Sequence, residues 1–336
     1  MTLVSERRVM HLQAYLLGIL LAQPVVVLAD ATSNDAHVWL DKMAEAVRRL
    51  NYDGTFIYWH DDQLETVRIV HQSDPQGERE RLVSLTGAAR EIIQSGEELT
   101  CYLPDQKSVM VSKSHPRKPY PLNLPKDTSR LTKNYEVTLS HTERMAGNDS
   151  QIVTIMPRDG YRYGYRLWLD NQNGMPLKSD LLDEHGTAVE QVMFTNIEFL
   201  KQIPPELLQP TLSGSGYVWH NDVDAAGEVL VVDKSAWRVT RLPDGFMLTH
   251  HSRHPMPDSK VPTEHMVFSD ALASLSVYID QAGDDKRMLN GMSHMGAVNA
   301  YGKIVGGYHV TVVGDVPRAT VQMVGESLRY QSVSPQ

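Results

Sequence analysis

The feature that most constrains the fold of this chain is a repeated alternation of apolar and polar residues with a period of two. It begins at residues 55–60 and 64–73, which are separated by the turn 61–63 and followed by the turn 74–77. Strand signals of this kind recur as far as residue 199, and the pattern predicts an antiparallel meander. We expect a curled or nearly closed sheet, because a flat one would leave its edges and one apolar face exposed.

Two helices are predicted beside these strands. The first is capped by Asn34 or Asp35, and its apolar side chains recur with helical spacing at Leu40, Met43, Ala44 and Val47. The second begins at Asp315 with Pro317 in its first turn, and its buried stripe is Val321, Val324, Gly325 and Leu328. The predicted fold class is therefore mainly antiparallel β with a few helices (α+β). It comprises a large domain and a smaller antiparallel-sheet domain with a C-terminal helix.

The N-terminus has the features of a signal peptide. Arg7 and Arg8 precede an apolar run over residues 12–22, and small residues follow where cleavage is expected. We place cleavage after Ala29, with Ala31 as the alternative, so that residues 1–29 are removed. The apolar run is too short and too interrupted for a transmembrane helix. The mature chain is therefore predicted to be exported.

The mature chain divides into two predicted domains. Residues 30–200 carry the long meander, and residues 217–330 form the smaller domain. Residues 201–216 between them combine prolines, which stiffen a chain, with a Ser/Gly run, which loosens it, and this mixture suits a hinge. A second proline-rich stretch, residues 115–125, is either a lid over a cavity or an ordinary surface crossover.

Charge and cysteine content exclude several classes of function. The formal net charge is −9 and becomes −10 without residues 1–29, which contain Glu6, Arg7 and Arg8. An acidic chain argues against general nucleic-acid binding, which needs a basic surface. Cys101 is the only cysteine, so no intrachain disulfide can form.

The motifs that resemble catalytic or metal sites lack the geometry that such sites need. His250 and His251 are neighbours on a predicted strand and point to opposite faces, so one Zn site cannot easily use both. Ser293 stands in a stretch that resembles a nucleophile elbow, but Met295 occupies a position that needs glycine. We therefore predict no metal, no cofactor and no enzyme activity.

Two neighbouring stretches carry a family resemblance. Residues 162–170, with the sequence RYGYRLWLD, and residues 174–180, with the sequence GMPLKSD, resemble the signature hairpin of the MucB/RseB family. Members of this family are periplasmic regulators of the sigma-E envelope-stress response. The resemblance covers essentially the whole mature chain. It implies that the larger domain is an open half-barrel similar to the lipoprotein carriers LolA and LolB, with an apolar concave side.

The resemblance also implies two sites. A curled sheet can hold acyl chains on its apolar side, and the candidate lining residues are Phe56, Tyr58, Leu103, Met156 and Trp168. The alternative that these five fill a closed core stays open. The smaller domain, together with surface near the linker, is implied to bind the periplasmic part of a MucA/RseA-type anti-sigma factor, with Tyr301, Tyr308 and His309 as candidate contacts. The alternative is that these three are cross-strand pairs that stabilise the sheet.

The predicted function is that of a periplasmic, non-enzymatic negative regulator of sigma-E-type transcription. It would bind the anti-sigma factor, shield it from site-1 proteolysis, and release it when lipid or lipopolysaccharide enters the larger domain. One alternative is a LolA/LolB-like carrier of lipid or lipoprotein, which leaves residues 217–330 without a role. Another is a hydrolase that uses Ser293 and His294. The sequence leaves open whether the chain forms a homo-oligomer.

Overall fold

The computed structural model describes residues 29–96, 98–112, 124, 128–221, 230–231, 235–254, 262–282 and 288–331. The predicted signal peptide lies outside the described residues except for Ala29, and the proline-rich stretch 115–125 except for Leu124. No helix in the described part of the chain is both long and apolar enough to cross a membrane.

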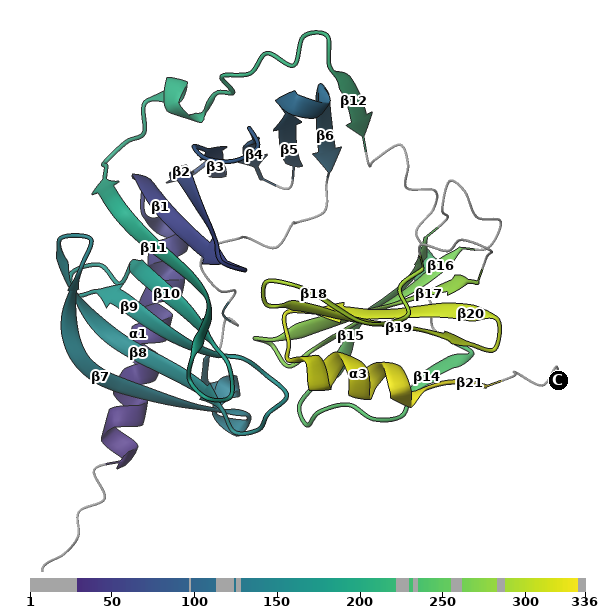
Figure 1. Cartoon of the computed structure of the whole chain (residues 1–336). Helices are drawn as coiled ribbons and strands as arrows, with labels where there is room; N and C mark the ends of the chain where they lie inside the picture. Colours follow the sequence, from purple (N-terminus) through teal and green to yellow (C-terminus); the bar gives the residue numbers. More distant parts are fainter. Residues whose placement is uncertain are drawn as a thin grey trace, which may run out of the picture.

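The larger of the two main sheets has twelve described strands and is open (Figure 1). Its strands are β1 (Tyr52–His60), β2 (Gln63–Asp74), β3 (Gly77–Ser84), β4 (Glu91–Ser95), β5 (Glu98–Leu103), β6 (Ser108–Ser112), β7 (Tyr135–Met145), β8 (Asn148–Pro157), β9 (Gly164–Asp170), β10 (Pro176–Leu182), β11 (Ala188–Phe199) and β12 (Val218–Asn221). They follow the order β12-β6-β5-β4-β3-β2-β1-β11-β10-β9-β8-β7. Because β12 and β7 end the sheet without pairing with each other, it does not close into a barrel.

The helix α1 (Ala29–Arg49) packs against the β7–β9 end of this sheet. Leu40 and Met43, from its predicted apolar face, are buried beside Tyr135, Val153 and Leu167. Short 3-10 helices lie at η1 (Pro104–Gln106), η2 (Thr128–Lys133) and η3 (Pro205–Leu208). The centre of the sheet has a second apolar cluster, which includes Phe56 of β1 and Phe194 of β11.

The smaller sheet has seven described strands and forms the second domain (Figure 1). In spatial order they are β13 (Leu230–Val231), β15 (Met247–His254), β16 (Thr263–Ser269), β17 (Ser274–Gln281), β20 (Tyr308–Gly314), β19 (Val298–Val305) and β18 (Gly291–Met295). The helix α3 (Arg318–Ser327) packs on β19 and β20, and β14 (Trp237–Val239) pairs with β21 (Leu328–Tyr330). The predicted fold class is therefore confirmed, although α3 begins one residue after Pro317, which forms its N-cap.

One predicted strand joins a different sheet from the one expected. The strand at residues 217–221, assigned to the smaller domain, forms as β12 but pairs in parallel with β6 of the larger sheet. Trp219 of β12 makes an edge contact with Tyr102 of β5, with 6.2 Å between the ring centroids. Backbone pairing and this contact place residues up to Asn221 with the larger domain.

The linker packs against the larger domain over residues 203–212 and does not have the contacts of a loose hinge. Arg81 and Glu91 form a buried ion pair on the sheet, with 2.6 Å between Nε and Oε1. Glu91 also accepts hydrogen bonds from the backbone N–H groups of Thr211 and Leu212, at 3.1 and 3.2 Å. Ile203 is buried in a cluster with Val70 of β2. Buried contacts therefore hold this part of the linker to the larger sheet.

Candidate functional site

A cavity of about 390 Å³ lies between the larger sheet and the hairpin that β18 and β19 form in the smaller sheet. Its apolar wall consists of five side chains from β1–β4, namely Phe56, Tyr58, Val67, Leu82 and Ile92. Met295, Gly296 and Val298 of the hairpin line it as well. Both domains therefore contribute to one cavity.

The strand register explains why these side chains share a face. Phe56 and Tyr58 are two residues apart on β1 and so point to the same side of the sheet. Phe56 lies opposite Val67 of β2, and Leu82 of β3 lies opposite Ile92 of β4. Period-two alternation in the sequence thus produces a continuous apolar surface across four strands.

Polar side chains line the remaining part of the cavity. They are His60, Glu65, Ser84, Arg90 and Glu190. The carboxylate of Glu65 lies 3.5 Å from His60 Nε2 and 3.5 Å from a guanidinium nitrogen of Arg90. Sequence analysis missed these residues, although the alternation along β1 places His60 on the same face as Phe56 and Tyr58.

Glu190 of β11 connects the cavity to the smaller domain. Its Oε1 accepts a hydrogen bond of 2.7 Å from the backbone N–H of Ala297. Burial raises the pKa of Glu190, while the hydrogen bonds from Ala297 and Tyr58 act in the opposite direction. Burial also raises the pKa of Tyr58, and the neighbouring Glu190 carboxylate adds to that effect. The Glu190 carboxylate thus holds the hairpin through this hydrogen bond, although partial burial disfavours its ionised form.

Residues around the tip of the β18–β19 hairpin make further contacts with the larger domain. The backbone N–H of Gly296 donates to the carboxylate of Asp61, which lies in the turn after β1. Asn299 Nδ2 donates to the hydroxyl of Tyr163 at 3.0 Å. The hairpin is therefore held by several hydrogen bonds where it lines the cavity.

A second interdomain contact is centred on Arg162, which precedes β9. Its Nε donates to Asp270 of the smaller domain, and the hydroxyl of Tyr135 donates to the same carboxylate at 2.9 Å. The guanidinium also contacts the backbone carbonyl of Asp244 and lies 5.0 Å from the ring centroid of Phe246. The first residues of the family signature therefore bind the smaller domain.

The five predicted lining residues do not all meet in the cavity. Phe56 and Tyr58 line it, whereas Leu103, at the end of β5, is half-buried and is not among its lining residues. Met156 of β8 and Trp168 of β9 lie on the opposite face of the sheet from the α1 core. Trp168 Nε1 donates to Glu143 at 2.8 Å, which satisfies the indole on that face.

The three predicted partner contacts are packed within the smaller domain. His309 is buried and its Nε2 donates to the carbonyl oxygen of Leu289 at 2.8 Å. Tyr308 packs against Trp237, with 5.3 Å between the ring centroids. Tyr301 lies beneath α3, where a side chain at Gly325 would meet its ring. This packing matches the alternative that they stabilise the sheet.

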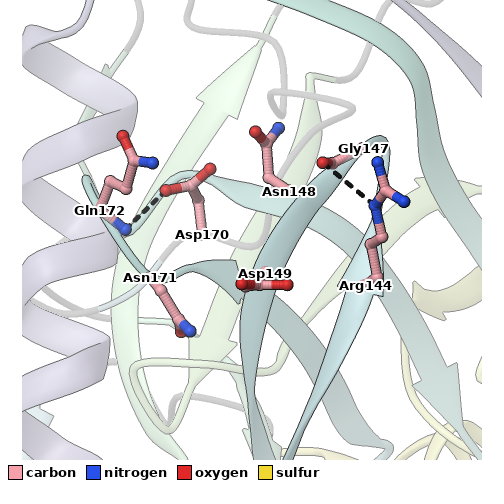
Figure 2. A pocket seen from close by; sticks show the side chains of 7 residues that line it. All are labelled: Arg144, Gly147, Asn148, Asp149, Asp170, Asn171 and Gln172. Atoms are coloured by element: carbon pink, nitrogen blue, oxygen red, sulfur yellow. Dashed lines mark hydrogen bonds between the residues drawn. The ribbon is translucent and has the colours of Figure 1, made fainter.

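The polar pocket in Figure 2, of about 460 Å³, is formed by two hairpin turns. Asp170 accepts hydrogen bonds from the backbone N–H groups of Gln172 and Asn173, at 2.7 and 3.1 Å, and Arg144 Nε donates to the carbonyl oxygen of Gly147 at 3.3 Å. These bonds stabilise the turns themselves.

The pairs His250–His251 and Ser293–His294 are each formed by consecutive residues of one strand, so the two side chains of each pair point to opposite faces. His250 contacts Ser252 at 2.9 Å, whereas His251 contacts Glu264 at 2.8 Å on the other face. Ser293 and His294 are consecutive on β18 and so point to opposite faces. Within the described ranges, no group of three or more His, Cys, Asp or Glu side chains is arranged to hold a metal ion.

These features define a class of protein: a two-domain, mainly antiparallel β protein with an apolar cavity walled by both domains. Residues 35–212 match the model of the MucB/RseB N-terminal domain, and residues 231–329 match that of the MucB/RseB C-terminal domain. The chain therefore belongs to the MucB/RseB family.

Individual relatives agree with this assignment. The sigma factor AlgU regulatory protein MucB of Pseudomonas aeruginosa is 32% identical over 332 residues, which cover 95% of this chain and 97% of the relative. The sigma-E factor regulatory protein RseB of Escherichia coli is 25% identical, over 87% of this chain and 89% of the relative. The solved complex structure of Pseudomonas aeruginosa MucA/MucB is similar with a TM-score of 0.69 at 29% identity, over 89% of this chain and 100% of that one.

Proposed function

We propose that this chain is a periplasmic, non-enzymatic regulator that binds the periplasmic domain of a MucA/RseA-type anti-sigma factor and shields it from site-1 proteolysis. Lipid or lipopolysaccharide in the cavity releases the partner, which ends the negative regulation of sigma-E-type transcription. The similarity to the solved MucA/MucB complex supports the partner. Family membership and the predicted signal peptide support the location.

The observation that carries the proposed switch is the shared wall of the cavity. Phe56 and Tyr58 belong to the larger domain, whereas Met295 and Val298 belong to the smaller one. A hydrocarbon chain between them must displace or repack the hairpin. A ligand shifts an equilibrium only if it binds two states with different affinity, and displacement of the hairpin supplies that difference.

The same hairpin offers a surface for the partner. Met295, near the tip of the hairpin, is 72% exposed although it also lines the cavity, and Ile304, at the far end of β19 beside the turn to β20, is exposed as well. We place partner contact on these two side chains, and assign to Tyr301, Tyr308 and His309 the role of holding the sheet beneath them. Ligand and partner then both contact Met295, which couples their binding.

A protease assay tests this function. The mature chain is mixed with the periplasmic segment of a MucA/RseA-type anti-sigma factor and a site-1 protease, with and without lipopolysaccharide. The chain should slow cleavage, and lipopolysaccharide should restore it. Equal cleavage with and without the chain would contradict shielding. The carrier alternative instead predicts that the mature chain moves a lipidated peptide between vesicles and leaves cleavage unchanged.

A further inference from the structure

The tip of the β18–β19 hairpin lies against two carboxylates of the larger domain. The consecutive backbone N–H groups of Gly296 and Ala297 donate to Asp61 and Glu190, and the bond from Ala297 to Glu190 measures 2.7 Å. Gly296 has a φ of +57°, and a Cβ atom at this position would lie 2.5 Å from Glu190 Oε1. The hairpin tip is therefore in direct contact with the Glu190 carboxylate.

Most of the charged groups around this contact are acidic. Glu190 lies opposite His60 in the register of β1 and β11, and His60 Nε2 lies 3.5 Å from Glu65. Arg90 also contacts Glu65, at 3.5 Å. The titratable and charged groups that surround Glu190 among the described residues are Tyr58, His60, Asp61, Glu65, Arg90 and Tyr163 of the larger domain and Asp315 of the smaller domain. When His60 is neutral, this group carries a net negative charge.

Asp315 acts on Glu190 across the contact between the domains. It precedes α3 of the smaller domain, whereas Glu190 belongs to β11 of the larger sheet. Burial raises the pKa of Glu190, and the Asp315 carboxylate adds to this increase. Release of the hairpin would return Glu190 to water, which relieves the burial and screens the repulsion. Both effects are therefore strongest while the hairpin is docked.

Proton uptake by Glu190 and docking of the hairpin are consequently linked. The pKa of Glu190 is higher with the hairpin docked than with it released, so the docked state binds the proton more tightly. The equilibrium shifts toward docking as the pH falls through the docked pKa toward the ordinary value of 4.5. A protonated carboxyl group keeps an oxygen that can accept the Ala297 N–H, so the contact survives protonation.

We propose that the β18–β19 hairpin is a pH-sensitive latch, which binds the larger domain more tightly when Glu190 takes up a proton. Met295 and Val298 of this hairpin line the cavity, so acid also holds that wall of the cavity in place. The inference goes beyond the proposed function, because the latch needs neither an anti-sigma factor nor a lipid. Its failure would leave the proposed regulator intact.

The backbone N–H of Ala297 reports docking directly. Its hydrogen-exchange rate is measured by NMR on the mature chain between neutrality and about pH 5, and is compared with the rate of an unstructured peptide at the same pH. The resulting protection factor should rise severalfold toward acid, by at most about tenfold per pH unit for one linked proton. Equal protection at every pH would overturn the latch.

A second amide separates opening of the hairpin from unfolding of the whole chain. Val277 is fully buried on β17, at the centre of the smaller sheet. Its N–H should be more protected than that of Ala297 at neutral pH, because the hairpin opens without global unfolding. Identical protection factors for the two amides at every pH would contradict a separate movement of the hairpin.

Substitution of Glu190 tests the proton-binding group. Glu190→Gln keeps an oxygen for the Ala297 N–H but cannot take up a proton, so Ala297 protection should lose most of its pH dependence. Addition of His60→Phe, which keeps a ring beside Tyr58, should remove the remainder. Glu136→Gln, at an exposed position on β7, is the matched control and should behave as the wild type does. A wild-type pH dependence in Glu190→Gln would overturn the proposal.

Asp315→Asn tests the repulsion across the contact and keeps the Glu190–Ala297 hydrogen bond. Removal of this carboxylate should raise Ala297 protection severalfold at neutral pH, toward the value that the wild type reaches in acid. The protection of Val277 verifies that the variant is folded. Unchanged or lower Ala297 protection at neutral pH in the folded variant would contradict the latch, whatever the outcome for Glu190→Gln.

Discussion

Arg162 of the larger domain and Asp270 of the smaller domain form a buried ion pair, with 2.5 Å between Nε and Oδ2. The side chain of Arg162 is 1% exposed and that of Asp270 is 0% exposed. A buried charge is stable only when it is paired, so this contact opposes separation of the domains. We therefore expect the proposed switch to move the hairpin beside Glu190 and to leave the Arg162–Asp270 pair intact.

Arg162→Met tests this buried pair. The substitution keeps much of the side-chain volume but leaves Asp270 without its guanidinium, and loss of one partner of a buried pair costs about 3–5 kcal/mol. We expect a decrease of that size in the free energy of unfolding, measured by urea titration. Arg166→Met, at a half-exposed position in the same hairpin, should cost less than about 1 kcal/mol. Equal losses for both variants would contradict a special role for Arg162.

Glu190 makes stability depend on pH. Because burial raises the pKa of Glu190 in the folded state, its ionised form opposes folding, and this unfavourable contribution is present above the folded pKa. It diminishes as the pH falls through the folded pKa toward the ordinary value of 4.5. The wild-type chain should therefore gain stability relative to Glu190→Gln as the pH falls from neutrality toward 4.5. A difference between the two chains that stays constant over this range would contradict the assignment.

Gly302 tests the framework role of the segment around His309. A side chain at Gly302 would place its Cβ 2.1 Å from the carbonyl oxygen of Leu289, the acceptor of the His309 hydrogen bond. Gly302→Ala must therefore shift the backbone, and we expect a loss of about 1–3 kcal/mol in thermal or urea unfolding. Gly160→Ala is the control, since no atom lies within 4 Å of its Cβ position. The account predicts little change there.

Glu91 tests the attachment of the linker. Glu91→Gln weakens the buried pair with Arg81 and the bonds to Thr211 and Leu212. We expect a loss of about 2–4 kcal/mol and faster protease cleavage within residues 205–216. Glu98→Gln, at an exposed position on β5, should alter neither measurement. Unchanged cleavage in Glu91→Gln would show that other contacts hold the linker.

Local patterns predicted much of the fold. Period-two alternation located the strands of the meander, and helical spacing located Leu40 and Met43 on the buried face of α1. Phe56 and Tyr58, two of the candidate lining residues that the family resemblance implies, line the cavity. Met156 and Trp168 lie on the other face, because sequence alone does not reveal which face of each strand is concave.

The contacts between domains could not be predicted in this way. Arg162 and Asp270 are 108 residues apart, and Glu190 and Ala297 are 107 apart. Their pairing depends on how the two folded sheets pack against each other, and local sequence periodicity does not predict that packing. The parallel addition of β12 to β6 has the same origin, because the strand pattern at residues 217–221 does not specify which sheet it joins.

The most direct test of the central claim is the affinity of the mature chain for the periplasmic segment of a MucA/RseA-type anti-sigma factor, measured by calorimetry with and without saturating lipopolysaccharide. Coupling through the shared cavity predicts a higher Kd with the ligand, by about 5–150-fold, the range for coupling energies of 1–3 kcal/mol. The same Kd in both titrations, with ligand binding verified independently, would contradict the account.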